Sequence, residues 1–208
     1  METLQLYGTR QSGHCHRVAL LLRMLNLPYD FIDAPAGVRQ AEDFRRLNPF
    51  GQVPVLLDGK RILTDSNAIM VYLVKRYAPG SHWLPEDPSS AARVQVWLSR
   101  AAGEVRYGPA SCRMVTQFSA PEDYPSALAI GGRFLPQMEQ HLSGRDFLAT
   151  GRPTIGDLAC YSYVAAAPEG GISLAPYPSI RRWAARIAAL PGFFAMPPLP
   201  LPGSVGRE

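Results

Sequence analysis

The sequence predicts a small α/β domain followed by an all-helical domain. Residues 3–8 alternate apolar and polar side chains, as a strand does, and Tyr29–Ile32 is a second short strand-like run. Between them, residues 14–26 carry valine and leucine at three- and four-residue spacing, which predicts a helix that stops at Pro28. Such a β-α-β unit favours parallel strands joined by a right-handed crossover, whereas only helical patterns follow Ser90.

The remainder of the first domain is indicated by turn and cap residues. A short helix is expected around Ala41–Leu47, ending before the Asn-Pro pair at residues 48–49. The runs VPVLLD and RILT flank an Asp-Gly pair at residues 58–59, which predicts an antiparallel hairpin. Asp65-Ser66 then precedes an apolar stripe at helical spacing. We therefore predict the element order βαβ-α-ββα for this domain.

The segment APGSHWLPEDPSS, residues 78–90, contains three prolines and a glycine and is typical of a linker. We expect domains at residues 1–79 and 88–208, with the linker at about residues 80–87. The second domain is expected to hold helices at Ala91–Tyr107, Ala127–Leu142, Thr154–Ala167 and Pro178–Leu190. Thr154 with Asp157 three residues later is close to a capping box, and the proline-rich tail PPLPLPGSVGRE predicts irregular or extended chain.

Composition excludes several classes of protein. A hydrophobic fraction of 47% supports a sizeable core and argues against a disordered chain. Cys15, Cys112 and Cys160 are odd in number and far apart, which favours a reducing compartment over a disulfide framework. We find no membrane-spanning run and no secretory signal, and the +4 charge is mostly scattered arginine. We therefore expect a cytoplasmic protein without membrane or nucleic-acid partners.

The run SGHCHRV, residues 12–18, concentrates groups that can do chemistry. Cys15 at a helix start could form a stabilised thiolate, but no second cysteine completes a C-x-x-C pair, so a small residue in the first helical turn is the favoured interpretation. His14 and His16 form H-x-H, while His82 and His141 are distant in sequence. No set of three or four convergent ligands can be assembled, so no metal site is expected. We expect His14 and His16 to be surface or capping residues.

Three further features admit two interpretations each. Ser12 lies between a strand end and a helix N-terminus, where it is either a plain N-cap or part of an anion site. The Asp65-Ser66 pair presents the same alternatives at the next helix. Pro54 either starts a strand or is a cis-proline that exposes the backbone of Val53 to a ligand. Their occurrence in this order within one small domain favours the functional interpretations.

Four segments resemble the glutathione transferase family, in order and over nearly the whole chain. They are LYGTRQSGHCHRVALLLRMLNLPY, FRRLNPFGQVPVLLDGKRILTDSNAIMVYL, RPTIGDLACYSYV and YPSIRRWAARIAALPGF. The second is the most specific, with its N-P-x-G-x-V-P and D-S-x-A-I elements. The pattern is similar to serine-type, bacterial theta- or beta-like cytosolic members. This resemblance implies a thioredoxin-like N-terminal domain packed on an all-α C-terminal domain, usually as a homodimer.

The resemblance also implies a catalytic residue. In serine-type members, the hydroxyl before the first helix donates a hydrogen bond to the sulfur of glutathione and favours its thiolate. Ser12 stands at that place, as an electrostatic stabiliser and not as a nucleophile. Tyr7, near the end of the first strand, is the rival in tyrosine-type members. Cys15 is the third candidate, because cysteine-type members form mixed disulfides with glutathione.

The remaining site residues are implied by the resemblance alone. The residues expected to bind glutathione are Ser12, His14, Arg39, Gln52, Val53, Pro54, Asp65 and Ser66. Asp65 stands where glutamate is common, and His14 where asparagine is common in similar bacterial sequences. Tyr107 is expected near the pocket of the second substrate, and Phe50 is a candidate dimer anchor.

The implied activity is conjugation of the glutathione thiolate to small apolar electrophiles, with glutathione as co-substrate and a role in detoxification. Two alternatives remain on the same scaffold: a glutathione-dependent reductase or isomerase, and a non-catalytic glutathione-binding protein. The fold alone does not choose among them, because one fold supports many functions.

Overall fold

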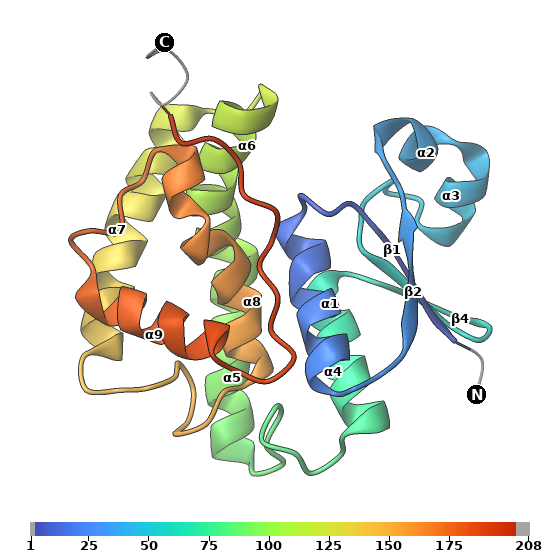
Figure 1. Ribbon diagram of the computed structural model, residues 1–208, viewed down its shortest axis with the longest axis horizontal. Coiled ribbons are helices and arrows are strands. Elements are labelled where there is room, and N and C mark those ends of the chain that lie inside the picture. The colour runs from blue at the N-terminus through green and yellow to red at the C-terminus, as the bar shows by residue number, and fades with distance from the viewer. Residues whose placement is uncertain (1–2, 203–208) are drawn as a thin grey trace.

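The computed structural model describes residues 3–202 and consists of two units side by side. One unit holds the strands with their helices, and the other holds helices (Figure 1). The sheet has the order β2-β1-β3-β4. Strand β1 (Leu4–Gly8) runs parallel to β2 (Tyr29–Asp33) and antiparallel to β3 (Val55–Asp58), which pairs with β4 (Arg61–Thr64). The predicted parallel pair and the predicted hairpin are both present.

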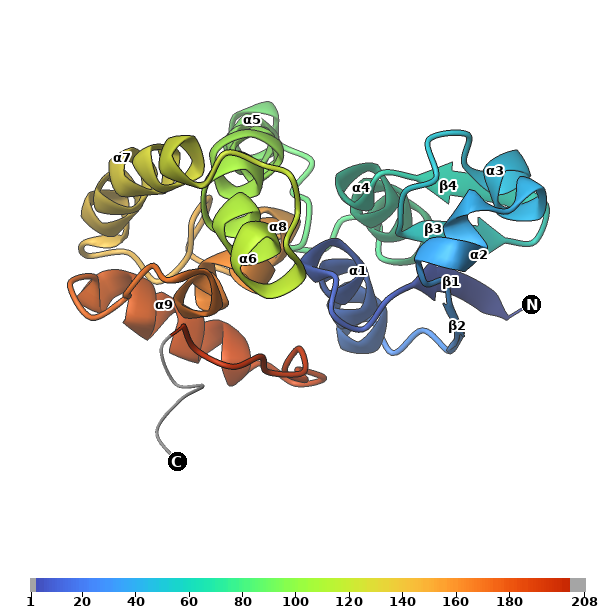
Figure 2. The same ribbon diagram turned by 90° about the horizontal axis from the view of Figure 1, so that it is seen from above.

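Helices cover both faces of this sheet (Figure 2). Helix α1 (Gly13–Met24) and helix α4 (Ser66–Tyr77) share one core with Leu4 and Leu6 of β1. On the other face lie α2 (Ala36–Gln40) and α3 (Glu42–Leu47). Helix α2 was not predicted, because it has only five residues and buries none of them, so it leaves no apolar periodicity to detect.

The second unit contains five α-helices among the described residues, with one π-helix and one 3₁₀ helix. These are α5 (Pro88–Arg100), the π-helix η1 (Ala101–Ala110), α6 (Ser111–Phe118), α7 (Tyr124–Leu142), α8 (Ile155–Ala165), the 3₁₀ helix η2 (Ala167–Gly170) and α9 (Pro178–Ala188). Each of the four predicted helices has a counterpart. Residues 197–201 of the proline-rich tail form no regular element, and residues 203–208 lie outside the described residues.

The helix predicted to end at Tyr107 instead continues through η1 into α6. The continuation contains Pro109, and a proline inside an α-helix removes a hydrogen bond and clashes with the preceding turn. Here this stretch is π-helical, with a wider turn. Gly108 lets it approach α7 closely, since a Cβ atom there would lie 2.9 Å from the backbone nitrogen of Gly131.

Residues 78–87 connect α4 to α5, in the segment expected to be the linker. The exact limits at residues 79 and 88 stay predictions. Among the helices formed by residues 3–202, none has both the length and the apolar character needed to cross a bilayer.

Helix α8 is the centre of the helical domain, and the predicted capping box at its start is present. Asp157 is fully buried. Its carboxylate accepts hydrogen bonds from the Leu148 N–H at 2.8 Å and the Trp183 Nε1–H at 2.9 Å. It also accepts from the Thr154 N–H at 2.8 Å and the Thr154 hydroxyl at 2.9 Å. One carboxylate thus joins α8 to α9 and to the segment that precedes α8.

We expect Asp157→Asn to destabilise the protein by about 3 kcal/mol, because an amide nitrogen replaces one acceptor and faces buried donors. The measurement is the midpoint of urea unfolding. Asp87→Asn is the matched control: Asp87 caps α5 at the surface, and asparagine caps a helix as well as aspartate does. Equal midpoints for the two variants would contradict the central role of Asp157.

Candidate functional site

Ser12 is the N-cap of α1, in an extended backbone conformation. Its Oγ accepts the N–H of Cys15 at 3.3 Å, and its own N–H donates to the Thr9 carbonyl at 3.1 Å. Accepting that bond uses a lone pair of the oxygen and leaves the hydroxyl hydrogen for a second partner. The side chain is partly exposed, so this second partner can be a bound molecule.

The start of α4 lies beside the start of α1. Asp65 caps α4 by accepting the N–H groups of Asn67 and Ala68, each at 2.9 Å. Its φ of 65° is uncommon for a residue other than glycine, and such strain is concentrated at functional sites. The next residue, Ser66, has its Oγ 3.4 Å from Nδ1 of His14. Two helix N-termini, each with a hydroxyl group, therefore converge on one region.

Arg17 is the residue of this region that sequence reasoning missed. It is 1% exposed, and its Nη1 donates to Ser66 Oγ at 3.4 Å and to Asn67 Oδ1 at 3.1 Å. Within residues 3–202 its Nε and Nη2 have no hydrogen-bond partner, and no carboxylate forms an ion pair with it. The sequence held a signal, since Arg17 lies four residues before the buried Leu21, on the apolar side of α1.

Two more arginines add positive charge near the start of α1. Burial is the largest cause that lowers the pKa of His14, and the charges of Arg17 and Arg106 lower it further. The charge of Arg39 likewise acts to lower the pKa of the Cys15 thiol. The buried Nε of Arg39 has no hydrogen-bond partner among the described residues. A region with unpaired guanidinium nitrogens and two helix N-termini favours an anionic ligand.

Cys15 lies inside the core, at 1% exposure, next to Gly8. Burial raises the pKa of its thiol. The nearby Ser12 hydroxyl, a backbone hydrogen bond at Thr9, Arg39 and Arg17 only partly offset that effect. A buried, protonated thiol is a poor nucleophile. This geometry supports the interpretation of Cys15 as a small packing residue.

Tyr7 points to the opposite face of the sheet from α1. Residues alternate along a strand, so Tyr7 faces away from the core that holds its neighbour Leu6. Its ring packs edge-on against Phe44 of α3, with ring centroids 6.3 Å apart. This orientation argues against Tyr7 as the partner of a sulfur held at Ser12.

His16 contradicts the expectation of a surface or capping residue. It is 4% exposed and contacts the helical domain through both ring nitrogens. Nε2 lies 2.9 Å from the Phe194 carbonyl and Nδ1 2.9 Å from Ser162 Oγ. Since a carbonyl can only accept, Nε2 carries the proton and Nδ1 accepts from the hydroxyl. His14 is only partly exposed, and its ring packs against Tyr163 at 5.1 Å.

The other predicted site residues lie around this group, and no hydrogen bond within residues 3–202 joins Arg39, Gln52 or Tyr107 to it. The Val53-Pro54 bond is cis, as one of the two interpretations held. The side chain of Gln52 is exposed, and its carbonyl accepts from Asn48 Nδ2 at 2.8 Å. Tyr107 is exposed on η1, beneath the guanidinium of Arg106. In the part of the chain that the structure describes, no three His, Cys, Asp or Glu side chains cluster as metal ligands would.

The mixed four-stranded sheet with helices on both faces, joined to a helical domain, defines a protein of thioredoxin-like architecture with an all-helical second domain. Models of the glutathione S-transferase N-terminal and C-terminal domains match residues 6–82 and 105–191. The chain is 32% identical to glutathione S-transferase 3 of Zea mays, over 98% of this chain and 99% of the relative. The chain belongs to the glutathione S-transferase family.

Two further comparisons agree with this assignment. A glutathione S-transferase crystal structure from Xanthobacter autotrophicus matches with a TM-score of 0.87 and 31% identity, covering 94% of this chain and 98% of that chain. A probable maleylacetoacetate isomerase of Vibrio cholerae is 27% identical over 93% of this chain and 94% of the relative. The relatives of this chain therefore carry names that describe more than one activity.

The buried histidine predicts a pH dependence of stability. Burial, the largest cause, lowers the pKa of His16 from 6.5 to about 4. Between these two pH values the unfolded chain binds a proton at His16 and the native state does not. The free energy of unfolding therefore decreases as pH falls from 6.5 towards 4, by at most roughly 3 kcal/mol. We expect His16→Asn to reduce this slope in urea unfolding between about pH 7.5 and pH 4.5. His14 contributes in the same direction, so part of the slope remains. Identical slopes in the variant and the wild type would contradict the assignment.

Proposed function

We propose that the protein conjugates the thiolate of glutathione to small apolar electrophiles. The observation that supports this most is the Ser12 hydroxyl at the N-terminus of α1, near buried arginine nitrogens that have no partner in the part of the chain described by the structure. Glutathione carries two carboxylates and a thiol, which suits a positive region of this kind. Ser12 would donate a hydrogen bond to the sulfur and favour the thiolate over the thiol.

The other residues would hold the rest of glutathione. The backbone of Val53, before the cis Pro54, would pair with the cysteinyl part. Asp65 would bind the amine of the γ-glutamyl residue. Ser66 and the N–H groups at the start of α4 would bind the carboxylate of the same residue. Arg39 and Gln52 would lie towards the glycyl carboxylate, and His14 would border the γ-glutamyl end. The thiolate would then attack an electrophilic carbon and either displace a leaving group or add to an activated double bond.

The second substrate would bind at the domain boundary near Tyr107, which is exposed on η1. π-Helical turns are frequent at functional sites, and this one carries both Tyr107 and Arg106. A role in detoxification and a cytoplasmic location are part of the same proposal.

We expect Ser12→Ala to lower kcat for conjugation of chlorodinitrobenzene about tenfold or more, and to raise the apparent pKa of the bound thiol. The variant loses a helix cap, worth about 1 kcal/mol, so it should still fold. The measurement is the pH dependence of kcat/KM. Coincident profiles for wild type and Ser12→Ala would contradict the role of the hydroxyl.

Two variants separate this proposal from its alternatives. Cys15→Ser should retain conjugation, whereas a reductase that works through a mixed disulfide would lose its activity. Tyr7→Phe should also retain conjugation. An isomerase, which is what the name of the Vibrio cholerae relative describes, would rearrange its substrate and consume no glutathione. Binding of glutathione without turnover of any electrophile would favour the non-catalytic alternative.

We also propose that the protein forms a homodimer anchored by Phe50. This side chain is 84% exposed at the tip of the loop before the cis-proline. A cavity of about 270 Å³ lies between α5 and α7, and its lining includes Val96, Trp97, Phe134 and Met138. A phenylalanine ring fits this volume and chemistry, so the cavity would receive Phe50 of the second copy.

We expect Phe50→Ser and Val96→Arg each to convert the dimer to a monomer, because each removes one side of the same apolar contact. Sedimentation equilibrium measures the mass. Ile62→Ser, which removes another exposed apolar side chain, is the control and should leave the dimer intact. A monomeric wild-type protein would contradict the proposal, and so would dimers of unchanged affinity in both variants.

A further inference from the structure

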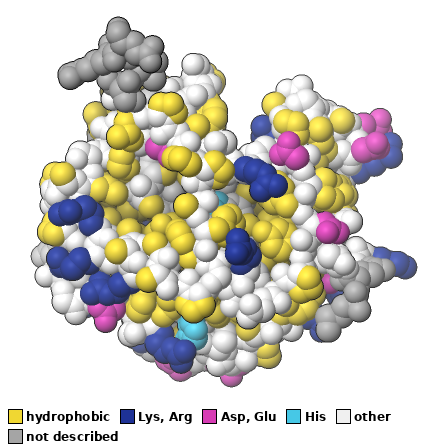
Figure 3. Space-filling model, in the orientation of Figure 1, with side chains coloured by type: hydrophobic (Ala, Val, Ile, Leu, Met, Phe, Trp, Pro, Cys, Tyr) yellow, Lys and Arg dark blue, Asp and Glu magenta, His cyan; other side chains and the backbone are white. Residues whose placement is uncertain are grey.

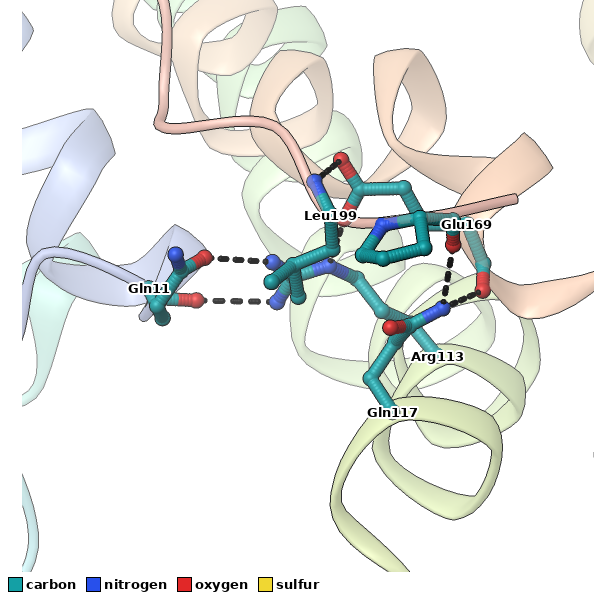
Figure 4. A network of polar contacts seen from close by, with 6 residues as sticks. Gln11, Arg113, Gln117, Glu169 and Leu199 are labelled. Atoms are coloured by element: carbon teal, nitrogen blue, oxygen red, sulfur yellow. Dashed lines mark hydrogen bonds and ion pairs between the residues drawn. The ribbon is translucent and has the colours of Figure 1, made fainter. Parts of the chain in front are cut away.

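Arg113 of α6 reaches across the domain boundary to the loop that ends at Ser12 (Figure 4). Its Nη1 donates to the backbone carbonyl of Gln11 at 2.8 Å, and its Nη2 donates to Gln11 Oε1 at 3.1 Å. Arg113 is 1% exposed and lies 102 positions from Gln11 in the sequence. One buried guanidinium therefore holds both the main chain and the side chain of the residue before Ser12.

The guanidinium is itself held in place by the C-terminal part of the chain. Its Nε donates to Glu169 Oε2 at 2.5 Å, and Glu169 Oε1 accepts the N–H of Leu199 at 3.1 Å. Gln117 Nε2 bridges the carbonyls of Glu169 and Pro200, at 2.6 and 2.9 Å. The tail that follows α9 thus fixes the carboxylate, and the carboxylate fixes the arginine.

The backbones of η2 and α6 pack closely together beside this network. A Cβ atom added at Gly170 would lie 2.6 Å from the backbone nitrogen of Arg113, so only glycine lets η2 approach α6 this closely. The approach places Glu169 beside Arg113. A planar guanidinium with fixed donors is better suited than an ammonium to hold three acceptors in one geometry.

We propose that Arg113 is a positioning residue for Ser12, and that Glu169 and the tail segment at Leu199 set its orientation. The proposal rests on the proposed function in one respect, that the Ser12 hydroxyl acts on a bound sulfur. Arg113 acts on that sulfur only through the loop. A hydroxyl has to be held within about 0.5 Å of its productive position to stabilise a thiolate well. Within the loop itself, the Ser12 N–H donates a hydrogen bond to the Thr9 carbonyl.

The first test measures the loop directly, by amide hydrogen exchange at residues 9–15 in Arg113→Met. We expect exchange in this segment to be faster by about threefold or more, with less change in Arg113→Lys, which keeps one donor for the Gln11 carbonyl. Arg186→Met is the matched control, because it removes a partly exposed ion pair with Asp146 in the same domain, without contact to the loop. Unchanged exchange in Arg113→Met overturns the proposal, whatever Ser12 does in catalysis.

The second test is a double-mutant cycle between Arg113→Met and Ser12→Ala. We expect Arg113→Met alone to lower kcat about tenfold and to raise the apparent pKa of the bound thiol, with little change in the KM for glutathione. In the Ser12→Ala background the same substitution should have little further effect. Additive losses overturn the proposal, because Arg113 would then act by another route. If Ser12→Ala alone has no effect, the proposed function fails instead, and the exchange experiment still decides on Arg113.

Where Arg113→Met fails to fold, Glu169→Gln gives the same information. It keeps the shape of the side chain and weakens the bond that orients the guanidinium. We expect a smaller loss of kcat in the same direction, and the same non-additivity with Ser12→Ala. A loss of stability with an unchanged pH profile would assign Glu169 and Arg113 a purely structural role and overturn the proposal.

Discussion

Helix α1 is buried between the sheet and the helical domain, so its packing links the two units and places the candidate site. Most of its residues are buried, so its polar side chains have to find partners in the elements around it. His16 does so with Ser162 and the Phe194 carbonyl, both in the helical domain. Gly13 is required where Tyr163 approaches the helix, since a Cβ atom there would lie 2.8 Å from that ring. The site at the start of α1 therefore belongs to both domains.

Arg17 is an exception to this rule, and the exception is informative. A buried guanidinium with two nitrogens that find no partner among residues 3–202 costs free energy that a folded protein seldom accepts without a function. An anionic ligand at the α4 N-terminus would offset this cost, because it would bring negative charge to Ser66, which Arg17 contacts. The unpaired positive charge would therefore lower the stability of the free protein and raise its affinity for an anionic ligand.

Two buried arginines near the candidate site have different roles in the proposed chemistry. Arg17 of α1 contacts Ser66 of α4, which would bind the ligand itself. Arg113 contacts the loop before Ser12 and carries no ligand contact in the proposed arrangement. Apolar side chains are exposed around the boundary between the two units, among scattered arginine and lysine (Figure 3). Such a mixed surface suits an apolar second substrate beside an anionic first one.

Local elements could be predicted from the sequence: the strands, the 58–59 hairpin turn, the α8 capping box and the helix starts at Ser12 and Asp65. These follow from side-chain periodicity and from caps that act within a few residues. The cis bond at Pro54 was one of two alternatives that the sequence left open. Periodicity does not reveal the burial of His16, the core position of Cys15 or the partners of Arg113, which arise only when the elements pack together. Those outcomes depend on residues up to 178 positions apart, because burial and pairing are set by which surfaces meet.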